Sequence, residues 1–189
     1  MEKKHTSTLT AISKNRLEFL FDGIFAIAMT ILVLELKVPE LIDRQSINEL
    51  SVALMQKAPT FASYLLSFVM LGILWYRHNQ HYHHFIMITK AMFTLHLIQL
   101  AAAAFFPFCA ALIGQYPGNV ISFFFYIGCI LVYTWASLLN WVVAKRFGAI
   151  TNEISETGYK DIRTRLLRAC LIISILFALA TVRLFNTKI

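Results

Sequence analysis

Five long apolar runs in this chain can span a bilayer, and no other feature constrains its fold so strongly. They cover about 17–37, 58–76, 91–113, 120–143 and 166–185. A helix of about 20 apolar residues crosses the hydrocarbon core of a bilayer. Helices also satisfy their own backbone hydrogen bonds there, as lone strands do not. The sequence therefore predicts an all-α, polytopic membrane helix bundle with five spans.

Composition supports a membrane protein with one domain. Only 14% of the 189 residues are charged and 58% are hydrophobic, whereas soluble domains carry roughly a quarter charged residues. We expect a single transmembrane domain over residues 1–189. Three scattered cysteines, Cys109, Cys129 and Cys170, lie in apolar runs and fit no metal motif, so we interpret them as small core residues.

The basic residues indicate topology and not nucleic-acid binding. With the N-terminus inside, 12 of the 17 lysines and arginines fall in inner segments, and the remaining five fall outside. The inner ones are Lys3, Lys4, Lys14, Arg16, Arg77, Lys90, Lys145, Arg146, Lys160, Arg163, Arg165 and Arg168, and the outer ones are Lys37, Arg44, Lys57, Arg183 and Lys188. Such an excess marks the cytoplasmic side, so we expect a multi-pass protein of the cell membrane with a cytoplasmic N-terminus.

The first run carries an apolar stripe. On a helix turning about 100° per residue, one face collects residues within roughly 60° of one another, with Thr30 beside them. Its members are Arg16, Leu20, Gly23, Ile27, Ile31 and Leu34. Such a stripe packs within a bundle, or it faces an axis around which several copies assemble. In the second case, rings of Ile27, Ile31 and Leu34 would form a hydrophobic constriction that controls wetting of a pore.

Asp22 lies roughly 140° from Ile27 on the same helix, so we expect it to face other helices of its own subunit. A carboxylate partly withdrawn from water needs charge-assisted hydrogen bonds. His78, Trp75 or Arg16 could supply them, in a polar network between helices.

Four of the six histidines lie between His78 and His84. His78 and His81, or His81 and His84, share a helix face and have the spacing of metal ligands. No carboxylate or cysteine accompanies them, so we favour hydrogen-bonding anchors over a metal site. We expect no cofactor.

The first motif resembles that of the transmembrane protein 175 family of potassium-permeable channels. The family carries an Arg-x-x-x-Phe-Ser-Asp signature followed by an apolar run. Here Arg16 and Asp22 match at the family's spacing, while Leu20 and Phe21 replace the Phe and the Ser.

A second motif supports the same resemblance. The family's Trp-x-x-His-His pattern corresponds to Trp75, His78 and Asn79, with the second histidine replaced. Ser67-Phe68 and Phe106-Pro107-Phe108 also fit, and the resemblance is best over residues 16–118.

The resemblance implies a homotetramer around a central axis, with a pore lined by the first helix over about 16–37. Ile27, the narrowest ring, Ile31 and Leu34 match the family's pore-lining layers, and Thr30 lies beside them. Arg16, Asp22, Trp75 and His78 match its inter-helix network. The family usually has six spans against the five here, so either a sixth is absent from this chain or the C-terminus lies outside. Losing the signature serine requires Phe21 to pack against apolar groups.

Together these features predict a passive channel for potassium and other monovalent cations, selective through partial dehydration at apolar rings. The alternative is a proton-coupled transporter using Asp22, Glu18 and the histidines. Its weakness is the absence of mid-membrane acids and of paired broken helices. A metal-dependent membrane enzyme is disfavoured, since we find no nucleophile–base pair, and we expect no enzyme activity.

Overall fold

A computed structural model describes residues 13–186 of the chain. Its helices are α1 (Lys14–Ile31), the short 3-10 helix η1 (Leu32–Glu35), α2 (Ile47–Gln56), α3 (Ala58–Tyr82), α4 (Lys90–Gln115), α5 (Val120–Arg146) and α6 (Glu156–Asn186). Five are long and apolar enough to cross a membrane: α1 with η1, α3, α4, α5 and α6. The predicted class, an all-α bundle with five spans, is confirmed. Lys3, Lys4 and Lys188 lie outside the described residues.

Two helices extend well past the predicted runs into charged sequence. α3 continues to Tyr82 and α6 begins at Glu156. The apolar runs indicate only the part of a helix that lies in lipid. In α6, Arg165 donates to Asp161 one turn earlier, a pairing that supports an exposed helical end.

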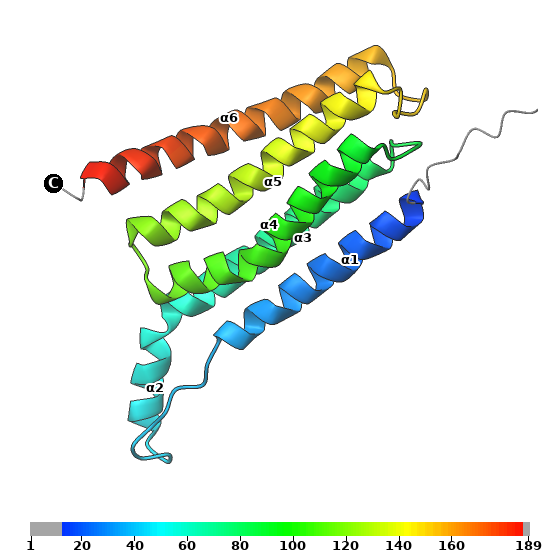
Figure 1. Cartoon of the computed structure of the whole chain (residues 1–189). Coiled ribbons are helices and arrows are strands. Elements are labelled where there is room, and N and C mark those ends of the chain that lie inside the picture. Colours follow the sequence, from blue (N-terminus) through cyan, green and yellow to red (C-terminus); the bar gives the residue numbers. More distant parts are fainter. Residues whose placement is uncertain (1–12, 187–189) are drawn as a thin grey trace, which may run out of the picture.

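Residues 47–56, which precede the second span, form a helix of their own, α2. α2 ends at Gln56, and α3 starts at Ala58 with a proline, Pro59, in its first turn. Proline lacks the N–H that would continue the hydrogen-bond ladder of α2, so the chain changes direction at Lys57. Figure 1 shows α2 at an angle to the bundle.

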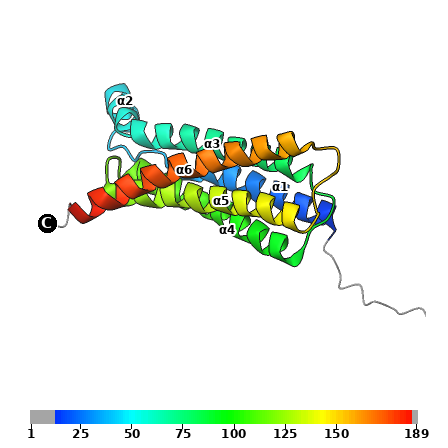
Figure 2. The same ribbon diagram turned by 90° about the horizontal axis from the view of Figure 1, so that it is seen from above.

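The spans pack as a bundle with α4 and α5 at its centre. α1 and α6 lie at opposite sides, and α3 and α4 lie between α1 and α5 (Figures 1 and 2). α1 packs on α3 and α4, whereas α6 packs chiefly on α5. Consequently α4 and α5 bury far more side chains than α6 does.

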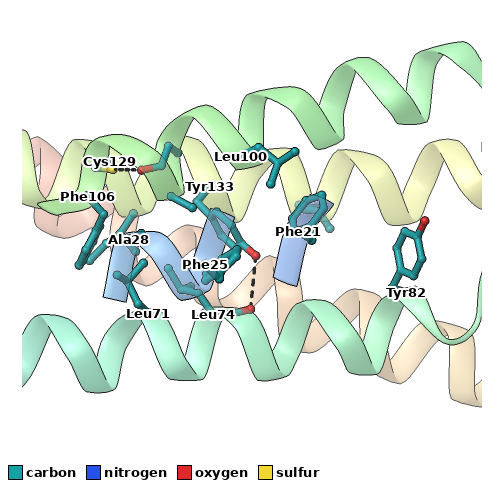
Figure 3. Packing of buried hydrophobic residues seen from close by; sticks show 14 of the residues in the cluster. Phe21, Phe25, Ala28, Leu71, Leu74, Tyr82, Leu100, Phe106, Cys129 and Tyr133 are labelled. Atoms are coloured by element: carbon teal, nitrogen blue, oxygen red, sulfur yellow. Dashed lines mark hydrogen bonds between the residues drawn. The ribbon is translucent and has the colours of Figure 1, made fainter. Parts of the chain in front are cut away.

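The core around α1 is built from aromatic and aliphatic side chains. Phe21, Phe25 and Ala28 of α1 are buried against neighbouring helices (Figure 3). Phe25 meets Tyr133 of α5 edge to face, and the Tyr133 hydroxyl donates to the Leu74 carbonyl of α3 at 3.3 Å. These two contacts join α1, α5 and α3 to one another.

Short connections join the helices at both ends of the bundle. At one end, the loops after α3 and α5 pair: Ile86 N–H donates to the Ala149 carbonyl at 2.8 Å, and Thr151 N–H to the His84 carbonyl at 2.9 Å. At the other, the α4–α5 turn passes through Gly118 with φ +80°, a left-handed conformation that glycine adopts without strain.

Candidate functional site

The predicted pore residues lie on one uncovered face of the first span, with Ile27 and Ile31 on α1 and Leu34 on η1. Ile27, Ile31 and Leu34 are 58%, 40% and 70% exposed. Thr30 is also exposed, and its hydroxyl donates back to the carbonyls of Ala26 and Ile27. The stripe therefore points away from the bundle, while the opposite face of α1 packs in the core.

Exposure alone does not separate a pore face from a lipid face. The outer face of α6 is equally apolar and exposed, through Leu171, Ile172, Ile175 and Leu179. Inside a membrane either face can meet lipid tails or another protein surface. α3 also exposes large apolar side chains, among them Leu65, Leu66 and Val69. The helices α1 and α6 lie on opposite sides of the bundle (Figure 1).

Of the predicted network, the structure brings Asp22 and Trp75 together. The indole N–H of Trp75 donates to Asp22 Oδ1 at 2.8 Å, joining α1 to α3. Arg16 lies exposed near the start of α1. Within residues 13–186 its guanidinium has no hydrogen bond or ion pair to Asp22.

His78 takes a different place from the one expected. Its ring stacks on Phe21 with centroids 3.6 Å apart and planes 5° apart. It is buried with Phe21 in the core, not hydrogen-bonded to Asp22. Phe21 itself is fully buried, the packing required by the loss of the signature serine.

A buried polar cluster beside His78 was not predicted. His96 Nδ1 lies 3.0 Å from Gln99 Oε1 and 2.9 Å from Asn140 Nδ2, while Gln99 Nε2 donates to Ser137 Oγ. His96, Gln99 and Asn140 are each at most 2% exposed. Their signal in the sequence was the presence of strongly polar residues within apolar spans, with His96 and Gln99 one helical turn apart.

Three atoms of this cluster have no partner among the described residues: His78 Nε2, His96 Nε2 and Asn140 Oδ1. Their residues line a small cavity of about 10 Å³. A polar cavity needs roughly 10–15 Å³ to hold one water molecule. The site is therefore polar enough for one water and is at the lower limit of size.

Two histidines near the end of α3, His81 and His84, pack on an aromatic side chain. The rings of His81 and His84 lie 5.8 and 6.0 Å from that of Trp141 on α5. Over residues 13–186, no three His, Cys, Asp or Glu side chains form a group able to hold a metal ion.

The fold first defines a class: a multi-pass helical membrane protein whose spans leave several apolar faces uncovered. Residues 16–107 match the sequence model of the family described as the endosomal/lysosomal potassium channel TMEM175. The resemblance to the TMEM175 family predicted from the sequence is confirmed over this region, which contains α1, α2, α3 and most of α4.

Relatives with curated names match the same part of the chain. A potassium channel of Streptomyces collinus is 35% identical over 101 residues, which cover 53% of this chain and 48% of that one. A potassium channel of Chamaesiphon minutus is 33% identical over 53% of this chain and 49% of that one. The human endosomal/lysosomal proton channel TMEM175 is 34% identical over 48% of this chain and 19% of its own length. The chain thus spans about half the length of the bacterial relatives and less of the human one.

Similarity in structure extends further than similarity in sequence. The crystal structure of a lysosomal potassium-selective channel TMEM175 homolog from Chamaesiphon minutus superposes with a TM-score of 0.74 at 25% identity. The superposition covers 89% of this chain and 87% of that one. It therefore includes α5 and α6, beyond the region matched by the family.

Proposed function

We propose that this protein is a passive potassium-permeable cation channel of the cell membrane. Four copies surround an axis, each contributing α1 to the pore, and the N-terminus lies in the cytoplasm. The observation that carries the proposal is the uncovered stripe of Ile27, Ile31 and Leu34 on α1 and η1, within a region that matches a family of named potassium channels.

The choice of α1 over α6 as the pore helix rests on where the sequence match lies. Both helices leave an apolar face uncovered, but the match with the family covers α1 and ends at Pro107, before α5 and α6. A shared channel function is carried most economically by the shared segment. The α6 face then meets lipid at the periphery.

Selectivity in this channel comes from apolar rings. Four isoleucines at position 27 make a constriction without hydrogen-bonding groups, so an ion passes only by shedding part of its hydration shell. Potassium gives up water more easily than sodium does, because its charge is spread over a larger ion. Hydrophobic constrictions of this kind control permeation through wetting.

Asp22 and Trp75 hold the pore helix in place and do not line the pore. Their hydrogen bond joins α1 to α3 on the side of α1 turned toward the bundle. Moving α1 would break a hydrogen bond to a charged group, a bond of about 1.5–3 kcal/mol.

Flux through the purified protein in liposomes tests the proposal. The proposal predicts potassium flux down its gradient, smaller sodium flux, and no need for a proton gradient. Because the human relative is named a proton channel, proton flux is measured in parallel with a pH-sensitive dye. Flux that stops when the proton gradient is removed would support the proton-coupled transporter instead.

A further inference from the structure

A basic cleft opens at the end of the bundle where the proposed topology puts the cytoplasm. It lies between the end of α3 and the start of α6 and has a volume of about 570 Å³. The residues that line it are Arg77, Gln80, His81, His83, His84, Ile162 and Arg165. Two guanidinium groups and three imidazoles are present in this lining, and no carboxylate.

Arg77 is the less exposed of the two arginines that line the cleft. Its side chain is half-buried and makes no hydrogen bond or ion pair with another residue between 13 and 186. A partly buried charge without a counter-charge is costly. Its position therefore calls for an anion from outside the chain.

The second guanidinium, that of Arg165, can leave its ion pair at little cost in free energy. Arg165 pairs with Asp161 within α6, but both side chains are mostly exposed, at 71% and 57%. Exposed pairs of this kind contribute about 0–1 kcal/mol. Arg165 can therefore turn from Asp161 toward a stronger anion in the cleft.

The surroundings are electropositive. In the loop after α3, burial first, and then the neighbouring His83 and Lys14, lower the pKa of His84, against an opposing effect of Glu153. Part of the lowering of the His84 pKa thus comes from positive charge at the rim of the cleft.

We infer that this cleft binds a phosphate group, held by Arg77 and Arg165. Guanidinium groups bind phosphate through paired, charge-assisted hydrogen bonds. Basic pockets between transmembrane helices on the cytoplasmic side bind phospholipid head groups. The same chemistry fits a free phosphate. The site goes beyond the proposed channel function.

The cleft takes five of its lining residues from α3 and the loop that follows it, and two from α6. Lys14 at the start of α1 reaches its rim, where its ammonium group donates to the His83 carbonyl at 3.4 Å.

Thermal unfolding of the full-length protein in neutral detergent tests this inference. One series adds phosphatidic acid, with diacylglycerol, which lacks the phosphate, as its control. The other adds inorganic phosphate, with chloride as its control. The expected result is a rise in Tm with a phosphate-bearing ligand that neither control reproduces.

Variants connect the binding to the cleft. Arg77→Gln and Arg165→Gln should each weaken binding by about tenfold or more, as expected for the loss of a charge-assisted hydrogen bond. Arg163→Gln is the matched control, because Arg163 lies on the same helix but does not line the cleft. Arg77→Lys keeps the charge without the planar fork, and its weaker binding provides the test if Arg77→Gln does not fold.

The outcomes are distinct. Cleft-dependent binding of both ligands assigns the site to phosphate from either source, and binding of phosphatidic acid alone assigns it to a lipid head group. No binding, or an equal loss in Arg163→Gln, overturns the inference, since the effect would then come from general surface charge.

Discussion

Phe21 occupies the point where α1 meets the polar interior of the bundle. It stacks on His78 and contacts His96 edge to face, with centroids 5.4 Å apart. The next residue, Asp22, accepts the hydrogen bond from Trp75. Two neighbouring residues thus fix α1 by an aromatic contact and by a charge-assisted hydrogen bond.

The Asp22–Trp75 hydrogen bond should stabilise the subunit without affecting ion preference. Trp75→Phe removes the N–H donor and keeps an aromatic ring, so it should cost about 1–3 kcal/mol of stability. Unfolding in detergent measures this cost, and reversal potentials in potassium–sodium mixtures measure selectivity. Trp135→Phe is the control, because Trp135 donates to a neutral hydroxyl, that of Ser174. A changed potassium–sodium preference in Trp75→Phe would contradict this role.

The buried cavity beside His96 should hold an ordered water molecule. If His96 Nδ1 donates to Gln99, Nε2 needs a donor, and if Nδ1 accepts from Asn140, Nε2 needs an acceptor. Water satisfies either case and can also donate to Asn140 Oδ1, which lacks a partner among the described residues. An experimental structure that resolves ordered water should show it within hydrogen-bond distance of these atoms. An empty cavity, with His96 turned to another partner, would contradict the prediction.

Asn140 should be needed for stability, because it pairs with buried His96 across helices. Asn140→Leu keeps the size and removes one of the two hydrogen-bond partners of His96 Nδ1, at a cost of about 0.5–1.5 kcal/mol. Chemical denaturation in detergent measures the loss. Unchanged stability would mean that water replaces the amide.

At the scale of helices, α3 and α4 approach closely around Gly114. A Cβ at this position would lie 3.2 Å from both Thr60 Cα and Ser63 Cβ. The Ser63 hydroxyl donates to the Ala110 carbonyl at 2.6 Å, and that of Thr60 to the Gly114 carbonyl at 3.2 Å. Two small hydroxyl residues and one glycine hold the pair together, as is common between helices in membranes.

Gly114→Ala should therefore lower the thermal stability of the protein. Its methyl group must push two helices apart, at a typical overpacking cost of about 1–3 kcal/mol, against a gain in helix propensity of up to about 1 kcal/mol. Gly72→Ala is the matched control, since its Cβ would meet only Met29 Cε at 3.8 Å. A Tm equal to or above that of Gly72→Ala would contradict this account of the contact.

The spans were predictable because a bilayer requires long apolar helices, and five such runs stood in the sequence. Helix ends in water were less predictable. α6 begins at Glu156, well before the apolar run, and its first turns carry charged residues that a search for apolar runs leaves out. Pro59 marks the break between α2 and α3 in the sequence, but hydropathy alone does not detect it.

For the whole molecule, the candidate site was only partly readable from the sequence. Helical periodicity put Ile27, Ile31 and Leu34 on one face, and the structure leaves that face uncovered. The pairing of Asp22 with one of its three possible partners depended on how α1 and α3 lie side by side. His96 and Gln99 stand one helical turn apart in the sequence, but their grouping with Asn140 depends on the packing of α4 on α5.

The proposed assembly predicts a definite mass. A stable tetramer should have four times the 21.6 kDa chain mass, plus bound lipid, by native mass spectrometry in mild detergent. A monomer at every concentration that supports flux would contradict a pore between subunits, since one copy of α1 encloses no axis.

In the proposed tetramer, Ile27 forms the narrowest ring of the pore. The most direct test of this role is single-channel recording of Ile27→Asn in planar bilayers. Ile175→Asn serves as the control, a matching change on the exposed face of α6. A polar ring wets more readily, so Ile27→Asn should raise conductance and weaken the preference for potassium over sodium, while Ile175→Asn leaves both unchanged. Wild-type conductance and selectivity in a correctly assembled Ile27→Asn tetramer would contradict the account.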